Sequence, residues 1–313
     1  MNESLATDIV GRHYPHRTVV GVEPVASGHR PTAVVRFADR SPLVVQCSET
    51  IEAVRTEAAL VSAVRDRTDV PVPAVVATGS RDGRAYAISE FRPGTDLHTT
   101  FADSPPTVRR YIARQFGRYL GELHTAFAFD GCGELARASG PAGAGRLVAA
   151  SDTSETWLVE YGRRAVERLP AAFDPLRDRL CDCLDAATVD EVTPRLFPWD
   201  LRPGNALVAD GTVSAVLDWE RPMAAPPALA LSKAEYLVAD WYVDEPEPLR
   251  VAFRAGYERV RSLPTVAPAH RVVAIADSAV DSRGAVTNPG YPERARAASV
   301  DFHRTALASA LPG

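Results

Sequence analysis

Three oxygen-bearing side chains stand close together in one stretch of the sequence. Asp200 is followed five residues later by Asn205, and Asp218 comes 13 residues after that. A carboxylate and an amide oxygen are ligands that Mg²⁺ takes when it also binds phosphate and water. A second carboxylate, held off the metal, can accept the proton of an attacking hydroxyl. The spacing therefore indicates magnesium-assisted phosphate chemistry, and the alternative is two solvated aspartates that cap a turn and end a strand.

A hairpin between these residues would bring them together. Asp210-Gly211 separates two short apolar runs, and an Asp-Gly pair in that setting is typical of a two-residue β-turn. If the turn closes a hairpin, the numbers of paired residues sum to 421, so that Asn205 faces Val216. Asp218 then lies at the same open end as Asn205, where the preceding loop also enters. We expect all three side chains at this end.

The elements around the hairpin predict an α+β protein with two lobes. The first part of the chain alternates β-branched runs with turn residues and contains one long stretch of helical periodicity. Beyond a Pro/Gly break at residues 92–95, helical patterns dominate. We expect a small antiparallel-sheet lobe at 1–92 and a larger helical lobe, which contains the hairpin, at 93–313. The expected strands are 18–25, 32–38, 42–47, 70–78 and 85–91; the expected helices are 48–67, 104–127, 155–169, 175–187, 228–241, 246–260 and 271–281, with a loop at 131–146.

Composition excludes several classes of function. The 313 residues carry a formal net charge of −5, which gives no electrostatic support for nucleic-acid binding. No apolar run approaches the ~20 residues of a membrane span, and the N-terminus lacks the apolar stretch of a secretory signal. We therefore expect a cytoplasmic protein with no nucleic-acid or membrane partner. Lys233 is the only lysine, so any site in the first 232 residues that needs a cation must use arginine or histidine.

The hairpin sequence resembles a known family. WDLRPGNALV…VLDWE, at residues 199–220, is similar to the catalytic-loop and metal-binding signature of the aminoglycoside phosphotransferase and choline kinase group of small-molecule kinases. The resemblance implies a bilobal protein-kinase-like fold. It also implies transfer of a phosphoryl group from ATP or GTP, with Mg²⁺, to a hydroxyl of a small molecule.

Roles can be assigned by the same resemblance. Asp200 would be the catalytic base, Arg202 would steady phosphate charge, and Asn205 and Asp218 would hold Mg²⁺. The residues expected to bind the nucleotide are Ser27, Gly28 and Arg30 in a phosphate-covering turn, Gln46 on the third strand, Glu57 on the helix that follows, and Glu90 and Phe91 at the hinge.

The sequence departs from the family pattern at several places, among them the covering turn, which has one glycine where the family has several. Gln46 stands where a lysine would contact the nucleotide phosphates, and Arg30 or Arg36 would have to replace it. Pro198-Trp199 replaces the His-Gly that precedes the base, and Ala230 stands near an expected acid. Two alternatives follow: a nucleotide- or metabolite-binding regulator without transfer activity, or a kinase-like protein that acts on another protein.

The acceptor site is less defined by the sequence. We interpret the acids and aromatic residues that follow the hairpin first as a helix core with a solvated face. The alternative is a pocket that binds a cationic acceptor by charge and cation–π contacts. These residues are Glu235, Tyr236, Asp240, Trp241, Tyr242, Asp244 and Glu245. Asp277 with Asp281 forms a second acidic candidate, for which we favour the interpretation as surface acids.

Overall fold

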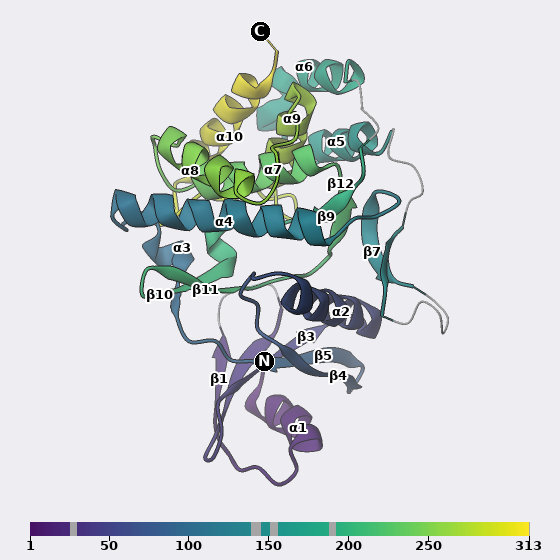
Figure 1. The fold of residues 1–313 in the computed structure, drawn as a ribbon, viewed down its shortest axis with the longest axis vertical. Helices are drawn as coiled ribbons and strands as arrows, with labels where there is room; N and C mark the ends of the chain where they lie inside the picture. Colours follow the sequence, from purple (N-terminus) through teal and green to yellow (C-terminus); the bar gives the residue numbers. More distant parts are fainter. Residues whose placement is uncertain (26–29, 139–144, 151–155, 188–191, 313) are drawn as a thin grey trace.

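A computed structural model describes residues 1–25, 30–138, 145–150, 156–187 and 192–312 of the chain. The N-terminal lobe is a five-stranded antiparallel sheet in the order β1-β2-β3-β5-β4, with α1 on one side and α2 on the other, as Figure 1 shows. Its elements are α1 (Glu3–His13), β1 (Val19–Val25), β2 (Thr32–Phe37), β3 (Leu43–Ser48), α2 (Ile51–Arg67), β4 (Val75–Arg81) and β5 (Arg84–Glu90). The predicted sheet lobe with one helix is confirmed, and α1 is an addition that the sequence did not predict.

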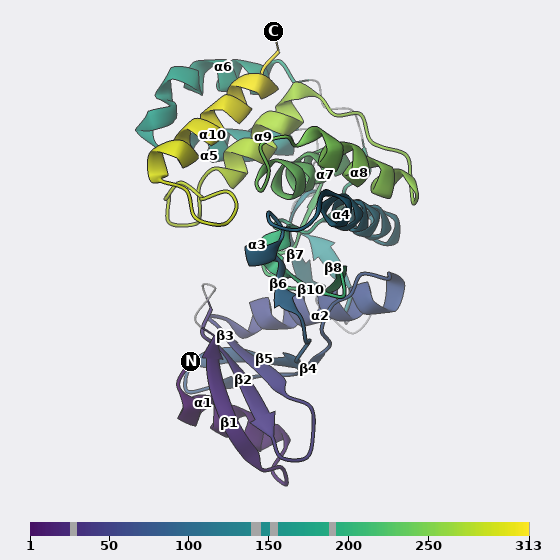
Figure 2. The same cartoon turned by 90° about the vertical axis from the view of Figure 1, so that its left-hand side faces the viewer.

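The second lobe is mainly helical and lies beyond a narrow waist (Figure 2). Its long helix α4 packs closely against α8, and small sheets near the waist carry the hairpin. Its elements are β6 (Thr95–Asp96), α3 (Leu97–Thr100), α4 (Pro106–Ala126), β7 (Gly133–Arg137), β8 (Leu147–Ala149), α5 (Trp157–Glu167), η2 (Ala171–Phe173), α6 (Asp174–Asp185), β9 (Arg195–Phe197), η3 (Pro203–Asn205), β10 (Ala206–Ala209), β11 (Thr212–Val216), β12 (Met223–Ala225), α7 (Pro227–Glu235), the π-helical turn η4 (Tyr236–Asp240), α8 (Glu247–Glu258), α9 (Pro268–Ser278) and α10 (Arg296–Ala310).

Two hydrophobic cores support these lobes. The smaller core lies between α1 and one face of the sheet, and includes Ile9, Val35 and Val45. The larger core fills the helical lobe and also takes in Leu60 and Val64 of α2. Helix α2 is therefore anchored on the helical lobe, so it can present an acid toward the waist from a fixed position. None of the described helices is long and apolar enough to cross a membrane.

Two expectations about elements were wrong. Residues 133–137, expected within a loop, form β7, because Gly133–Arg137 pairs with both β8 and β12. The hairpin register also shifts by one residue: Ala206, not Asn205, pairs with Val216. The cause is a bulge at Ser214, which drops out of the ladder and donates a hydrogen bond to the Pro93 carbonyl, 3.2 Å away.

Candidate active site

The open end of the hairpin brings together the side chains that the sequence predicted. Leu217 N–H donates to the Asn205 carbonyl at 2.7 Å, which holds the chain on both sides of the mouth. Asn205 Nδ2 donates to Asp200 twice, to its carbonyl oxygen and to Oδ2, each at 3.0 Å. Asp218 follows directly after this pairing and adopts a left-handed φ of 59°, a conformation that aspartate tolerates better than most residues. The one-residue shift therefore leaves the cluster intact.

Asp200 is held by one of its two carboxylate oxygens. Besides Asn205, Arg202 Nε donates to Oδ2 at 2.9 Å. The Arg202 guanidinium in turn lies over the ring of Trp241, with its central carbon 5.3 Å from the centroid. Because both hydrogen bonds end on Oδ2, Oδ1 is left to accept a proton from a substrate hydroxyl.

Asp218 lies in a region with excess negative charge. Burial, together with the carboxylates of Glu220, Glu57 and Asp200, raises its pKa to about 7, against the opposing effect of Arg30. Such a cluster is stabilised by an added cation. Asn205 also suits a metal site, because its Nδ2 is engaged by Asp200 and its Oδ1 is the atom that would face a cation.

The donor set fits Mg²⁺ better than a metal that needs a full protein cage. Within the described ranges, no group of three or more His, Cys, Asp or Glu residues is arranged to hold a metal ion. Asn205 and Asp218 supply an amide and a carboxylate oxygen, and Mg²⁺ commonly completes its six positions with phosphate and water. The site therefore matches a cation that arrives together with a nucleotide.

Arg30 is the cation that faces this cluster from the N-terminal lobe. Its Nη1 lies 2.7 Å from Glu57 Oε2, and its Nε lies 2.6 Å from Glu220 Oε2. Arg36, the other expected substitute for lysine, instead pairs with Glu23 on the exposed part of β1 and β2. Ser27 and Gly28 of the predicted covering turn lie outside the described residues.

The hinge region uses its backbone donors within the fold. Glu90 N–H donates to the Ala74 carbonyl at 2.9 Å, and Phe91 N–H donates to the Pro42 carbonyl at 3.4 Å. Both N–H groups are therefore engaged within the fold. The prediction that Glu90 and Phe91 contact a purine through backbone groups now applies to their carbonyl oxygens. The Glu90 side chain is also engaged, because its Oε2 accepts from Ala74 N–H at 3.2 Å.

Comparison with known proteins decides the family. Residues 21–270 match the sequence profile of the phosphotransferase enzyme family. The chain belongs to this family. The predicted resemblance is thereby confirmed, and the protein is a phosphotransferase.

Solved structures show the same fold over the whole chain. Aminoglycoside phosphotransferase APH(4)-Ia is similar with a TM-score of 0.68 at 14% identity, over 99% of this chain and 98% of that one. A ternary complex of a thermostable APH(4)-Ia mutant gives a TM-score of 0.65 at 15% identity, over 99% and 98%. Macrolide 2′-phosphotransferase MphH from Brachybacterium faecium gives 0.60 at 20% identity, over 99% and 99%. No curated protein sequence matches the chain significantly.

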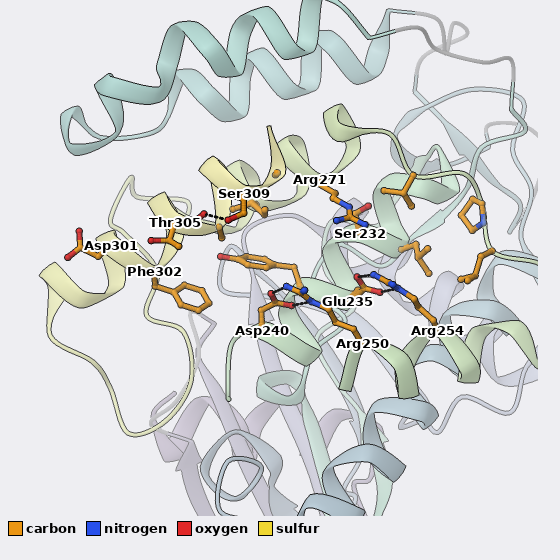
Figure 3. Close-up of a pocket in the computed structure, with 18 of the residues that line it drawn as sticks. Ser232, Glu235, Asp240, Arg250, Arg254, Arg271, Asp301, Phe302, Thr305 and Ser309 are labelled. Atoms are coloured by element: carbon orange, nitrogen blue, oxygen red, sulfur yellow. Dashed lines mark hydrogen bonds and ion pairs between the residues drawn. The ribbon is translucent and has the colours of Figure 1, made fainter. Parts of the chain in front are cut away.

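Two of the acids expected to bind a cationic acceptor, Glu235 and Asp240, are paired with arginines in this phosphotransferase. Glu235 accepts two hydrogen bonds from Arg254, at 2.5 and 2.7 Å, and Asp240 is paired in the same way with Arg250. These pairs line a cavity of about 890 Å³ between α7, α8, α9 and α10 (Figure 3). The lining of that cavity includes none of Asp200, Asn205 and Asp218. Tyr236 and Trp241 lie in the core, as the helix-core interpretation expects, and the two paired acids are not free to bind a cation. Acceptor binding by Asp244 and Glu245 stays a prediction.

Aromatic side chains, by contrast, reach residues 200–205, the predicted catalytic loop. The would-be Cβ of Gly204 would lie 3.3 Å from the Tyr242 hydroxyl, which is hydrogen-bonded to His98 Nδ1 at 2.9 Å. The His98 ring also contacts the half-exposed Tyr291 edge-to-face, with centroids 5.6 Å apart. Tyr242, His98 and Tyr291 therefore form an aromatic rim beside the catalytic loop. Tyr242 was among the candidates for the acceptor site, but no sequence pattern pointed to His98 and Tyr291, which join the rim from distant parts of the chain.

Asp277, the second acidic candidate, supports the catalytic loop from behind. Its Oδ2 lies 2.5 Å from Lys233 Nζ and 2.8 Å from Trp199 Nε1, and its Oδ1 lies 2.6 Å from Arg168 Nη2. Only 1% of its side chain is exposed, so it cannot contact an acceptor. Two signals could have pointed to this role: Lys233 is the only lysine, and Trp199 replaces a glycine directly before Asp200.

Proposed function

We propose that this phosphotransferase transfers the γ-phosphoryl group of ATP or GTP, with Mg²⁺, to a hydroxyl of a small molecule. The observation that carries the proposal is the cluster at the hairpin mouth, where Asn205 orients Asp200 and lies next to Asp218. The nucleotide part is supported by two relatives with the same fold, one complexed with AMP-PNP and hygromycin B and the other with GDP.

The residues of the cluster have distinct tasks in this reaction. Asn205 Oδ1 and Asp218 would hold Mg²⁺, which supplies positive charge to the phosphate oxygens when it is bound. Asp200 orients the acceptor hydroxyl and takes its proton on Oδ1 as the new oxygen–phosphorus bond forms. The bond between the γ-phosphorus and the bridging oxygen breaks, and the nucleoside diphosphate keeps that electron pair.

Arg202 keeps the base in position. Its bond to Asp200 Oδ2 holds the carboxylate, and its stacking on Trp241 holds the guanidinium. Arg202 therefore acts chiefly on the base, and phosphate contact is an additional role.

The aromatic rim indicates the kind of acceptor. Rings such as those of His98 and Tyr291 pack against the apolar faces of sugars and other hydroxylated rings. Glu235 and Asp240, which line the cavity between α7, α8, α9 and α10, are already paired with arginines, so they give no reason to require a cationic acceptor. We propose a hydroxylated ring compound, such as a glycoside, whose reacting hydroxyl points toward Asp200. The APH(4)-Ia ternary complex with hygromycin B is consistent with an acceptor of this size.

The test is phosphoryl transfer by the wild type and by Asp200→Asn. Incubation with γ-labelled ATP or GTP, Mg²⁺ and a panel of glycosides that includes hygromycin B should label one or more acceptors. Asp200→Asn should lower kcat by about 10²–10⁴ and leave nucleotide affinity within about threefold, because the base acts only on the proton.

A matched control makes the same chemical change elsewhere on the hairpin. Asp210→Asn lies at the exposed turn, where φ is 51° and asparagine is equally tolerated. Its activity should equal that of the wild type. Nucleotide binding without transfer to any acceptor would instead favour a nucleotide-binding regulator, and wild-type activity in Asp200→Asn would exclude Asp200 as the base.

A further inference from the structure

The N-terminal lobe lacks a cation at the strand position where the family resemblance expects one. That position is Gln46, and the first lysine of the chain is Lys233. On β3, the side chains of Leu43, Val45 and Cys47 are buried in the core shared with α1. Because side chains alternate along a strand, Gln46 lies on the opposite face of the sheet. A neutral amide there cannot offset the charge of a nucleotide triphosphate.

Arg30 reaches the same region from the segment that leads into the neighbouring strand, β2. It lies two residues before Thr32, the first residue of β2, and Thr32 pairs with Gln46 in the sheet. The side chain of Arg30 is only 16% exposed, and the carboxylates that hold it, Glu57 and Glu220, are 15% and 26% exposed. These values describe an ion pair inside the interlobe region rather than on the surface.

The two partners of Arg30 come from opposite sides of the waist. Glu57 lies in the middle of α2. This helix belongs to the N-terminal lobe, and its buried face packs into the core of the helical lobe. Glu220 follows the metal-binding candidate Asp218 by two residues, on the segment that leaves the hairpin. Arg30 therefore links the sheet lobe to the segment that carries Asp218.

We infer that Arg30 replaces the missing lysine as the cation that binds the nucleotide phosphates, with Glu57 as its fixed partner and Glu220 as the partner that phosphate displaces. The inference rests on the proposed function, since it assigns a contact to the nucleotide of that reaction. Arginine suits this task because its planar guanidinium carries five N–H donors and can bind a carboxylate and a phosphate together.

Charge explains why Glu220 is the partner that yields. Arg30 contributes one positive charge, whereas Glu57, Glu220 and Asp218 surround it with three carboxylates. Phosphate oxygens would be repelled unless one carboxylate moves away from the guanidinium. Glu57 is part of a helix anchored in the core, while Glu220 lies outside any helix or strand and is the more exposed of the two. Its release from Arg30 frees Nε for the phosphate.

The experiment measures the affinity of the full-length protein for AMP-PNP and GMP-PNP by calorimetry, with Mg²⁺ present. For the analogue that the wild type binds, Arg30→Gln should raise Kd by about tenfold or more, as expected for loss of a charge-assisted hydrogen bond. Adding Gln46→Lys to Arg30→Gln should bring Kd back to within about threefold of the wild type, because it returns a cation to the adjacent strand. Affinity for adenosine or guanosine, which have no phosphate, should not change.

Arg36→Gln is the matched control. It removes an arginine that is also paired with a glutamate on the same sheet, but this pair is 44% and 59% exposed. Its Kd should stay within about twofold of the wild type. Equal affinity of Arg30→Gln and the wild type would overturn the inference, whereas failure of the wild type to bind either analogue would overturn the proposed function itself.

Glu220→Gln tests the exchange without removing Arg30, and so covers the case in which Arg30→Gln does not fold. Its loss of charge should tighten analogue binding severalfold, because Arg30 no longer has to be released from a carboxylate. Thermal unfolding would verify that each variant is folded before binding is measured. Unchanged or weaker binding by Glu220→Gln would contradict the role given to Glu220.

Discussion

At the scale of single residues, the most completely buried charge in the described part of the chain lies behind the catalytic loop. Asp277 and Lys233 have side chains that are 1% and 4% exposed, and they form an ion pair that also engages Trp199 and Arg168. Burial alone would raise the pKa of Asp277, but Lys233 and Arg168 together hold it below its usual value. The carboxylate is therefore ionised, and it is the counter-ion of the buried Lys233 ammonium group.

Asp277→Asn is expected to destabilise the protein by about 3–5 kcal/mol, because it leaves Lys233 charged in the interior without a counter-ion. Urea unfolding of the two proteins would measure the difference. Asp301→Asn removes an exposed carboxylate on α10 and should cost less than about 0.5 kcal/mol. A loss below 1 kcal/mol in Asp277→Asn would show that the buried pair contributes little.

The same scale shows which site residues a sequence can reveal. Asp200, Asn205 and Asp218 were predictable because one short hairpin brings them together, so their spacing alone implies proximity. Arg30 was predicted in the phosphate-covering turn and as one of two substitutes for lysine. The choice between Arg30 and Arg36 could not be made, because it depends on Glu220, which lies 190 residues away from Arg30 in the chain. Asp277 looked like a surface acid because its lysine partner is on another helix.

At the scale of elements, the helical lobe is built on a close contact between α4 and α8. A Cβ added to Gly117 would overlap the Phe253 carbonyl oxygen, and one added to Gly256 would overlap the Arg114 carbonyl oxygen. The two helices therefore touch backbone to backbone at two reciprocal glycines. Helix α4 also holds the hairpin, because Gln115 Oε1 accepts a hydrogen bond from Val213 N–H at 3.2 Å.

Gly256→Ala should push α8 away from α4 and destabilise the protein by about 1–3 kcal/mol, even though alanine is the better helix former. Gly11→Ala gives the opposite expectation. Gly11 lies in α1, and nothing lies within 4 Å of its would-be Cβ, so the change should stabilise by up to about 1 kcal/mol. Thermal or urea unfolding would compare the three proteins, and a stable Gly256→Ala would mean that the two helices can separate without cost.

Hydrophobic periodicity in the sequence did not predict every element or its register. Helix α10 was not predicted, because the run from Arg296 to Ala310 is rich in alanine and polar residues and has no strong apolar stripe. The hairpin was predicted, but its register was not, because the bulge at Ser214 depends on a contact with Pro93. Local pattern fixes the type of an element, whereas tertiary contacts decide bulges and the docking of weakly patterned helices.

At the scale of the whole molecule, two buried histidines tie the helical lobe together. His124 on α4 shares a hydrogen bond of 2.8 Å with Tyr257 on α8. His303 on α10 does the same with Tyr236, also at 2.8 Å. Burial lowers the pKa of His124 to about 3 and that of His303 to about 4, from 6.5 in the unfolded chain. Both rings are therefore neutral in the folded protein at neutral pH.

This difference in pKa makes global stability depend on pH. The unfolded chain binds two protons as the pH falls below 6.5, and the folded protein does not bind them until about pH 4 and 3, so acid favours unfolding. The contribution of these histidines is complete above pH 6.5, and about 4 kcal/mol of it should be lost by pH 5.

Urea unfolding at pH 7.5 and pH 5.0 would measure this loss in the wild type and in the double variant His124→Gln/His303→Gln. The double variant should be less stable at pH 7.5 but should lose about 4 kcal/mol less on acidification, while His16→Gln, at an exposed position, should behave as the wild type. An unchanged pH dependence in the double variant would assign acid sensitivity to the carboxylates instead.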